Sequence, residues 1–227
     1  MIDSKLDNAI QEAAARVRVE TEGKLQPLRE AHRISGDLLL RLVHQGVFEA
    51  SSPTEGQSQR MSLTAGLIQS VSVSNNLIVS GFYWSAAAVL RQQMEAVARV
   101  VEIRTENYKG GTKTPDVALL PYGLAQNYGR LSELAHTSRG ELLGDFVQST
   151  AGEEVAMSEP YYRDRWAKEL LCVHLVHCVA LAHEIDLLHC ELYVGRNLIK
   201  VDEKLYPIAC VLVDEKFWKY FPEGKQE

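Results

Sequence analysis

Apolar residues recur along most of this 227-residue chain at the spacing of an amphipathic helix. Near the amino terminus Leu6, Ile10, Ala13 and Val17 follow one another three or four residues apart, and this spacing places their side chains on one face of a helix. The same period continues over residues 28–48, 61–106, 116–137 and 161–192. The sequence therefore predicts an all-α fold, a helical bundle.

Glycine, proline and small polar residues mark the predicted boundaries of these helices. Residues 50–59 are polar and contain proline and glycine, which indicates a loop, with Ser62 as the cap of the helix that follows. Gly81 lies inside the segment 61–106 and favours two helices there, or one that is broken. Residues 149–159 are small and acidic and are expected to form a mobile loop.

The pattern changes near the carboxyl end. Residues 197–201 and 208–213 are short β-branched runs on either side of Pro207, and such runs predict a short irregular or β-hairpin extension. We therefore expect a helical bundle domain over 1–193, with a C-terminal extension over 194–227 packed on the same domain.

Composition and charge limit where this protein can be located and what it can bind. With 46% hydrophobic residues the chain can bury a core, and its net charge of −6 excludes a basic field over the whole surface, so RNA would need a local patch. The amino terminus lacks the basic start of a signal peptide, and no Cys-x-x-Cys occurs, which predicts a cytoplasmic protein. Residues 170–183 are uncharged but shorter than the roughly 18 residues of a membrane span, so no membrane partner is expected and the segment is interpreted as a buried core helix.

A cluster of histidines and cysteines lies in that segment and just beyond it: His174, His177, His183 and His189, with Cys172 and Cys178. These side chains point in several directions around one helix, and His174 and His189 are about 22 Å apart, too far for one metal ion. His174 and Cys178 could chelate as an i, i+4 pair, but no partner helix is identifiable. The preferred interpretation is polar core groups that hydrogen-bond to neighbouring helices, with Glu95, Tyr128 or His136 as candidate partners.

Two further sets of polar residues share helix faces. Arg91 and Glu95 are four residues apart, and Tyr128, Ser132 and His136 repeat the same spacing, so each set lies on one face of its helix. Apolar neighbours surround Arg91 and Glu95. An unpaired charge there would be costly, so the two are expected to pair with each other or with the second helix.

The run 89–95, Val-Leu-Arg-Gln-Gln-Met-Glu, followed by 128–136, Tyr-Gly-Arg-Leu-Ser-Glu-Leu-Ala-His, resembles the pattern of HEPN-like bacterial helical families, several of them of unknown function. The resemblance covers roughly residues 60 to 140. It implies an all-α bundle that forms a homodimer, and an active motif of Arg, four to six residues, then His. Arg130 and His136 fit that spacing.

The resemblance implies a metal-independent endoribonuclease that uses the RNA 2′-OH as its nucleophile and needs no cofactor. His136 would act as general base or acid, because an imidazole can accept and donate a proton near neutral pH. Arg130 would hold the phosphate through its fork of donors. Whether the chain is an enzyme stays open at this point.

One alternative is a non-catalytic helical module that binds a partner protein. In it Arg91, Glu95, Tyr128, Ser132 and His136 would form an interior polar network. Two aromatic and basic runs, 161–168 and 216–221, could stack on single-stranded RNA or simply anchor helices through buried tyrosine and tryptophan rings.

A second alternative is a metal-binding bundle. Glu133 precedes His136, and Asp186 precedes His189, by three residues each; this acid-x-x-His spacing occurs in carboxylate-bridged di-iron bundles. Glu95 could supply another carboxylate. The set is short of the four carboxylates and two histidines of such sites, so no metal ligand is assigned.

Overall fold

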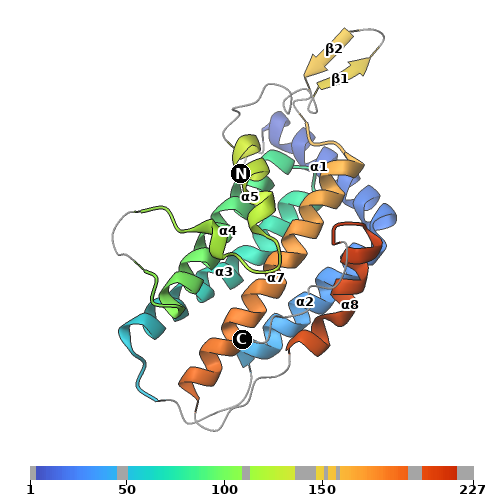
Figure 1. Ribbon diagram of the computed structural model, residues 1–227. Coiled ribbons are helices and arrows are strands. Elements are labelled where there is room, and N and C mark those ends of the chain that lie inside the picture. Colours follow the sequence, from blue (N-terminus) through green and yellow to red (C-terminus); the bar gives the residue numbers. More distant parts are fainter. Residues whose placement is uncertain are drawn as a thin grey trace.

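The structure is a computed structural model, and it describes residues 4–44, 51–108, 113–135, 147–150, 153–156, 159–193 and 201–218. Helices dominate these ranges, so the all-α prediction is confirmed (Figure 1). The elements are α1 (Lys5–Lys24), α2 (Gln26–His44), α3 (Glu55–Val79), α4 (Tyr83–Arg104), the 3-10 turn η1 (Val117–Leu119), α5 (Ala125–Ala135), β1 (Val147–Thr150), β2 (Glu153–Ala156), α7 (Asp164–Leu192) and α8 (Val201–Asp214).

Helix α3 begins earlier than predicted. Thr54 caps it by accepting a hydrogen bond from the Gln57 backbone N–H, while the Gln57 side chain accepts one from the Thr54 N–H. This reciprocal capping box satisfies two donors that a helix start leaves unpaired. The predicted cap at Ser62 and the predicted end of the loop at residue 59 are therefore wrong.

The predicted break at Gly81 is confirmed. Gly81 has a φ of 82°, a left-handed conformation that glycine adopts without strain. A Cβ at this position would also lie 3.1 Å from both the Tyr161 carbonyl oxygen and the Val17 side chain. The break lets α4 turn back along α3.

Helix α7 runs through the middle of the bundle (Figure 1) and packs against α2, α3, α4 and α8. Of its 29 residues, 20 are buried, so it has no continuous solvent-facing stripe and the interpretation of 170–183 as a core helix is confirmed. Among the described helices, α7 alone has the length and apolar content of a membrane span, and 89% of that apolar stretch is buried inside the protein.

The predicted C-terminal hairpin is wrong for residues 208–213, which lie within α8. Leu205, Ile208 and Leu212 are buried in the shared core, and their spacing of three and four residues is helical. Burial of that stripe against α2 and α7 outweighs the β propensity of the branched residues. Residues 197–200 of the predicted hairpin lie outside the described residues.

Two other segments also differ from their predictions. Residues 147–150 and 153–156 pair as antiparallel strands, with Val147 opposite Ala156, whereas a mobile loop was expected over 149–159. Within 116–137 the chain forms the short turn η1 before α5 begins at Ala125. Tyr122 and Gly123 have positive φ angles of 57° and 77°, and these end any continuous helix.

Candidate functional site between α4 and α5

The predicted pair on α4 is formed. The Arg91 guanidinium lies 3.0 Å from Glu95 Oε1, and the two side chains are 23% and 24% exposed. The apolar positions around them, Leu90 and Met94, are fully buried. The pair therefore lies at the rim of the core, where one charge neutralises the other.

Tyr128 on α5 closes a three-residue network with this pair. Its hydroxyl donates to Glu95 Oε1 at 2.6 Å and accepts from Arg91 Nε at 3.4 Å. Burial and then the Glu95 acceptor raise the pKa of Tyr128, and the Tyr128 hydrogen bond is the main cause of a raised pKa of Arg91. Arg91 also lies 5.7 Å from the centre of the tyrosine ring, so α4 and α5 are joined by both hydrogen bonds and a cation–π contact.

The other predicted members of the network are placed differently. Ser132 is on α5 and half-buried, but it takes no part in the described contacts among Arg91, Glu95 and Tyr128. His136 lies outside the described residues.

Arg130 is on α5 but contacts α7. Its Nη1 is 2.8 Å from Glu169 Oε1, and its guanidinium lies 5.1 Å from the Trp166 ring centre. Its Nη2 is buried without a hydrogen-bond partner. The structure therefore does not bring Arg130 into the Arg91, Glu95 and Tyr128 network, and the guanidinium is already paired with a carboxylate.

His174 on α7 has partners that the sequence analysis did not identify. His174 is fully buried; its Nδ1 lies 3.1 Å from Ser74 Oγ and its Nε2 lies 3.2 Å from His32 Nδ1. The proposed partners Glu95 and Tyr128 are wrong, since those two bond to each other and to Arg91. Partner helices for His174 therefore exist: α2 through His32 and α3 through Ser74.

The Ser74 hydroxyl is the centre of the contacts on one side of the His174 ring. It lies 3.1 Å from the Val71 carbonyl oxygen and 3.1 Å from His174 Nδ1, and it accepts a hydrogen bond from the Gln93 amide at 3.2 Å. On the other side of the ring, His174 Nε2 lies 3.2 Å from His32 Nδ1 and 3.7 Å from the Cys178 Sγ. Burial lowers the pKa of His174 and lowers that of His32 to about 4, so this chain of contacts stays neutral.

The sequence does contain a signal for these contacts of His174. His32 and Ser35 fall on the face of α2 that buries Leu28 and Leu39, and Ser74 falls on the buried face of α3. Polar residues on an otherwise apolar helix face indicate partners inside the core.

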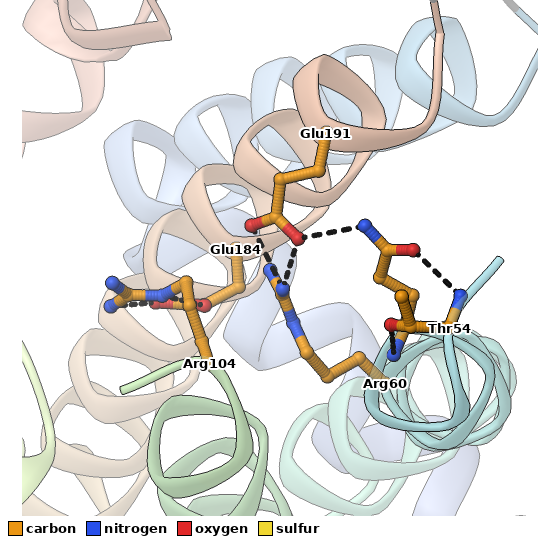
Figure 2. A network of polar contacts seen from close by, with 6 residues as sticks. Thr54, Arg60, Arg104, Glu184 and Glu191 are labelled. Atoms are coloured by element: carbon orange, nitrogen blue, oxygen red, sulfur yellow. Dashed lines mark hydrogen bonds and ion pairs between the residues drawn. The ribbon is translucent and has the colours of Figure 1, made fainter. Parts of the chain in front are cut away.

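Two ion pairs tie the far end of α7 to its neighbours (Figure 2). Arg60 of α3, 3% exposed, lies 2.6 Å from Glu191, and Arg104 of α4 binds Glu184 through Nε and Nη2 at 2.9 and 3.0 Å. Glu184 is 1% exposed. These carboxylates are engaged by arginines and hold helices together.

The metal-binding alternative finds no support within the described ranges. No group of three or more His, Cys, Asp or Glu side chains there is arranged to hold a metal ion. Glu133, Asp186 and His189 are described and form no such group. The di-iron set also needed His136, which is not among them.

Comparisons of the chain with protein-family models, with curated proteins and with solved structures found no match. The HEPN-like resemblance therefore stays a prediction from residues 89–95 and 128–136 alone.

Proposed function

We propose that this chain is a non-catalytic helical module that binds another protein, and that its α4 and α5 network is structural. The observation that supports this most is that the charged candidate residues already have partners within the fold. Arg91 is bonded to Glu95 and Tyr128. Arg130 is bonded to Glu169.

The pairing of Arg130 bears on the competing ribonuclease prediction. A phosphate-binding arginine needs free donors facing the substrate, whereas here the carboxylate of Glu169 lies at 2.8 Å. That carboxylate would repel a phosphate, so RNA would have to separate the pair before Arg130 could act. A structural role for Arg130 requires no such rearrangement.

A protein partner fits the surface that remains. Met61 and Val73 on α3, and Trp84 on α4, are exposed large apolar residues. Charged residues are depleted in the centres of protein interfaces, and methionine and aromatic residues are enriched there. Met61, Val73 and Trp84 give the exposed side of α3 and α4 part of this character.

The first experiment measures catalysis. The purified chain is incubated with a fluorescent single-stranded RNA in EDTA, next to His136→Ala and Arg130→Gln. We expect the same background signal from all three. Metal-independent cleavage by the wild type that is lost in His136→Ala would overturn the proposal in favour of the ribonuclease.

The second experiment measures the network. Tyr128→Phe removes only the hydroxyl that bonds α5 to Arg91 and Glu95 of α4, and should lower the free energy of unfolding by about 1 kcal/mol in urea titrations. Tyr108→Phe is the matched control, because Tyr108 is exposed and its ring can remain over Arg99. An equal loss in both variants would contradict a structural role for the Tyr128 hydroxyl.

A further inference from the structure

We infer that a polar cavity beside the last two turns of α4 binds a small zwitterion, a molecule of amino-acid or dipeptide size with one ammonium and one carboxylate. The cavity has a volume of about 380 Å³. Arg99 and Glu102 of α4 line it together with Lys113, Thr114 and Asp116 from the segment that leads into η1. A small-molecule site goes beyond the proposed protein-binding role and does not depend on it.

Two hydrogen bonds hold the segment 113–116 against α4. Arg99 Nη2 donates to the Lys113 carbonyl oxygen, and the Asp116 backbone N–H donates to Glu102 Oε1 at 2.7 Å. Arg99 and Glu102 form an ion pair with each other at 2.6 Å, and their side chains are 16% and 9% exposed. Both ends of the segment are therefore fixed to one helix before any ligand binds, which lowers the entropic cost of binding.

The two other charges of the lining are left without an ion pair. Lys113 and Asp116 are exposed, and within the described ranges they pair neither with each other nor with another charged side chain. Asp116 Oδ1 accepts from the Ala118 N–H at 3.0 Å, so Oδ2 can accept from a second donor. Three residues of chain span at most about 11 Å, so the two charges border the same small cavity.

These separated opposite charges indicate the class of ligand. Arg99 and Glu102 neutralise each other, so Lys113 and Asp116 are the charges that a ligand meets. An anion such as phosphate would be attracted by Lys113 but repelled by Asp116, and a cation would meet the reverse. A zwitterion satisfies both, because its carboxylate can bind the lysine while its ammonium binds the aspartate.

The size and the remaining lining also suit such a ligand. A volume of about 380 Å³ lies at the small end of the roughly 300–1,000 Å³ of small-molecule sites. Thr114 adds a hydroxyl, which both donates and accepts, and Leu119 adds an apolar contact for a ligand side chain. The cavity therefore offers polar groups for both ends of an amino acid and an apolar contact for its middle.

The experiment is isothermal titration calorimetry on the full-length chain with the common L-amino acids and with the dipeptide Gly-Gly. We expect at least one of them to bind with a Kd of about 1 mM or lower. Inorganic phosphate, and the N-acetyl and carboxamide derivatives of the best ligand, are titrated alongside. Each of these lacks one of the two charges and should bind at least ~10-fold more weakly.

Two variants locate the binding. Lys113→Met removes the cation, and Asp116→Asn removes the anion but keeps an oxygen that can accept from the Ala118 N–H. Each should weaken binding at least ~10-fold. The matched controls are Lys5→Met on α1 and Asp214→Asn on α8, which make the same charge changes at exposed positions and should leave the Kd unchanged.

The inference is overturned if none of the amino acids or Gly-Gly binds, or if phosphate binds as tightly as the best of them. It is also overturned if Lys113→Met and Asp116→Asn bind no more weakly than their controls. If either variant loses the helical circular dichroism of the wild type, the N-acetyl and carboxamide derivatives make the same comparison on the unaltered chain, and binding as tight as that of the free amino acid would overturn the inference.

Discussion

Replacing His177 with leucine should make this protein more stable at neutral pH and less sensitive to acid. His177 is completely buried near the middle of α7, and neither ring nitrogen has a hydrogen-bond partner. A buried polar group without a partner costs roughly 1–3 kcal/mol. Leucine fills a similar volume and carries no polar atom, so His177→Leu should gain about that much at pH 7.5.

The acid dependence follows from the pKa of the imidazole. Burial lowers the pKa of His177 to about 4, against about 6.5 in the unfolded chain. The unfolded chain therefore binds the proton first. Protonation of the unfolded chain at His177 therefore costs no stability above pH 6.5, and the free energy of unfolding falls as the pH drops from 6.5 toward 4. Between pH 7.5 and 5.0 the loss is about 2 kcal/mol.

Urea titrations followed by circular dichroism at pH 7.5 and 5.0 measure both effects. The difference between wild type and His177→Leu cancels the contribution of the carboxylates. His174→Leu is the contrasting variant, because it is one turn away and equally buried but removes the partner of Ser74 and His32; it should be less stable than the wild type at pH 7.5. The reasoning is refuted if His177→Leu loses as much stability in acid as the wild type, or is destabilised at pH 7.5.

Three other changes test separate contacts. Arg104→Met should lower the free energy of unfolding by about 3–5 kcal/mol, because it leaves the buried carboxylate of Glu184 unpaired; the double variant with Glu184→Leu should recover most of that loss, and failure to recover would point to lost packing instead. Thr54→Ala should lose about 1 kcal/mol through its cap, and an unchanged urea midpoint would contradict the capping role. Burial raises the pKa of Cys172 and of Cys178 to about 12, so neither should react with a thiol reagent at pH 8 until urea unfolds the chain; fast labelling of either, located by mass spectrometry, would show that α7 opens.

The helices could be predicted from the sequence because the residues that recur at the helical spacing are also the residues that the fold buries. Val17 and Leu28 are buried, as the 3.6-residue spacing predicted. Gly81 ends one helix and separates it from the next, as its position within the apolar segment predicted. The hairpin prediction for residues 208–213 was wrong because a β-branched run does not indicate which surface of the fold will cover it. In the fold α2 and α7 cover it, and the run is helical.

The candidate site was predictable where its contacts are local. Arg91 and Glu95 are four residues apart on one helix, and their pairing followed from that spacing. Glu169 comes 39 residues after Arg130, and no spacing rule connects residues that meet only through packing of α5 on α7. His32 was missed as the partner of His174 for the same reason, being 142 residues away in the sequence.

The central position of α7 has a consequence for synthesis on the ribosome. The chain emerges from its amino terminus, so α2, α3 and α4 are complete when α7, the helix that all three pack against, has not yet been made. At 5–20 residues per second, the 88 residues from Arg104 to Leu192 take roughly 4–18 s to translate. During that interval the nascent chain exposes the apolar faces that α7 later buries, which makes it a substrate for chaperones that act at the ribosome.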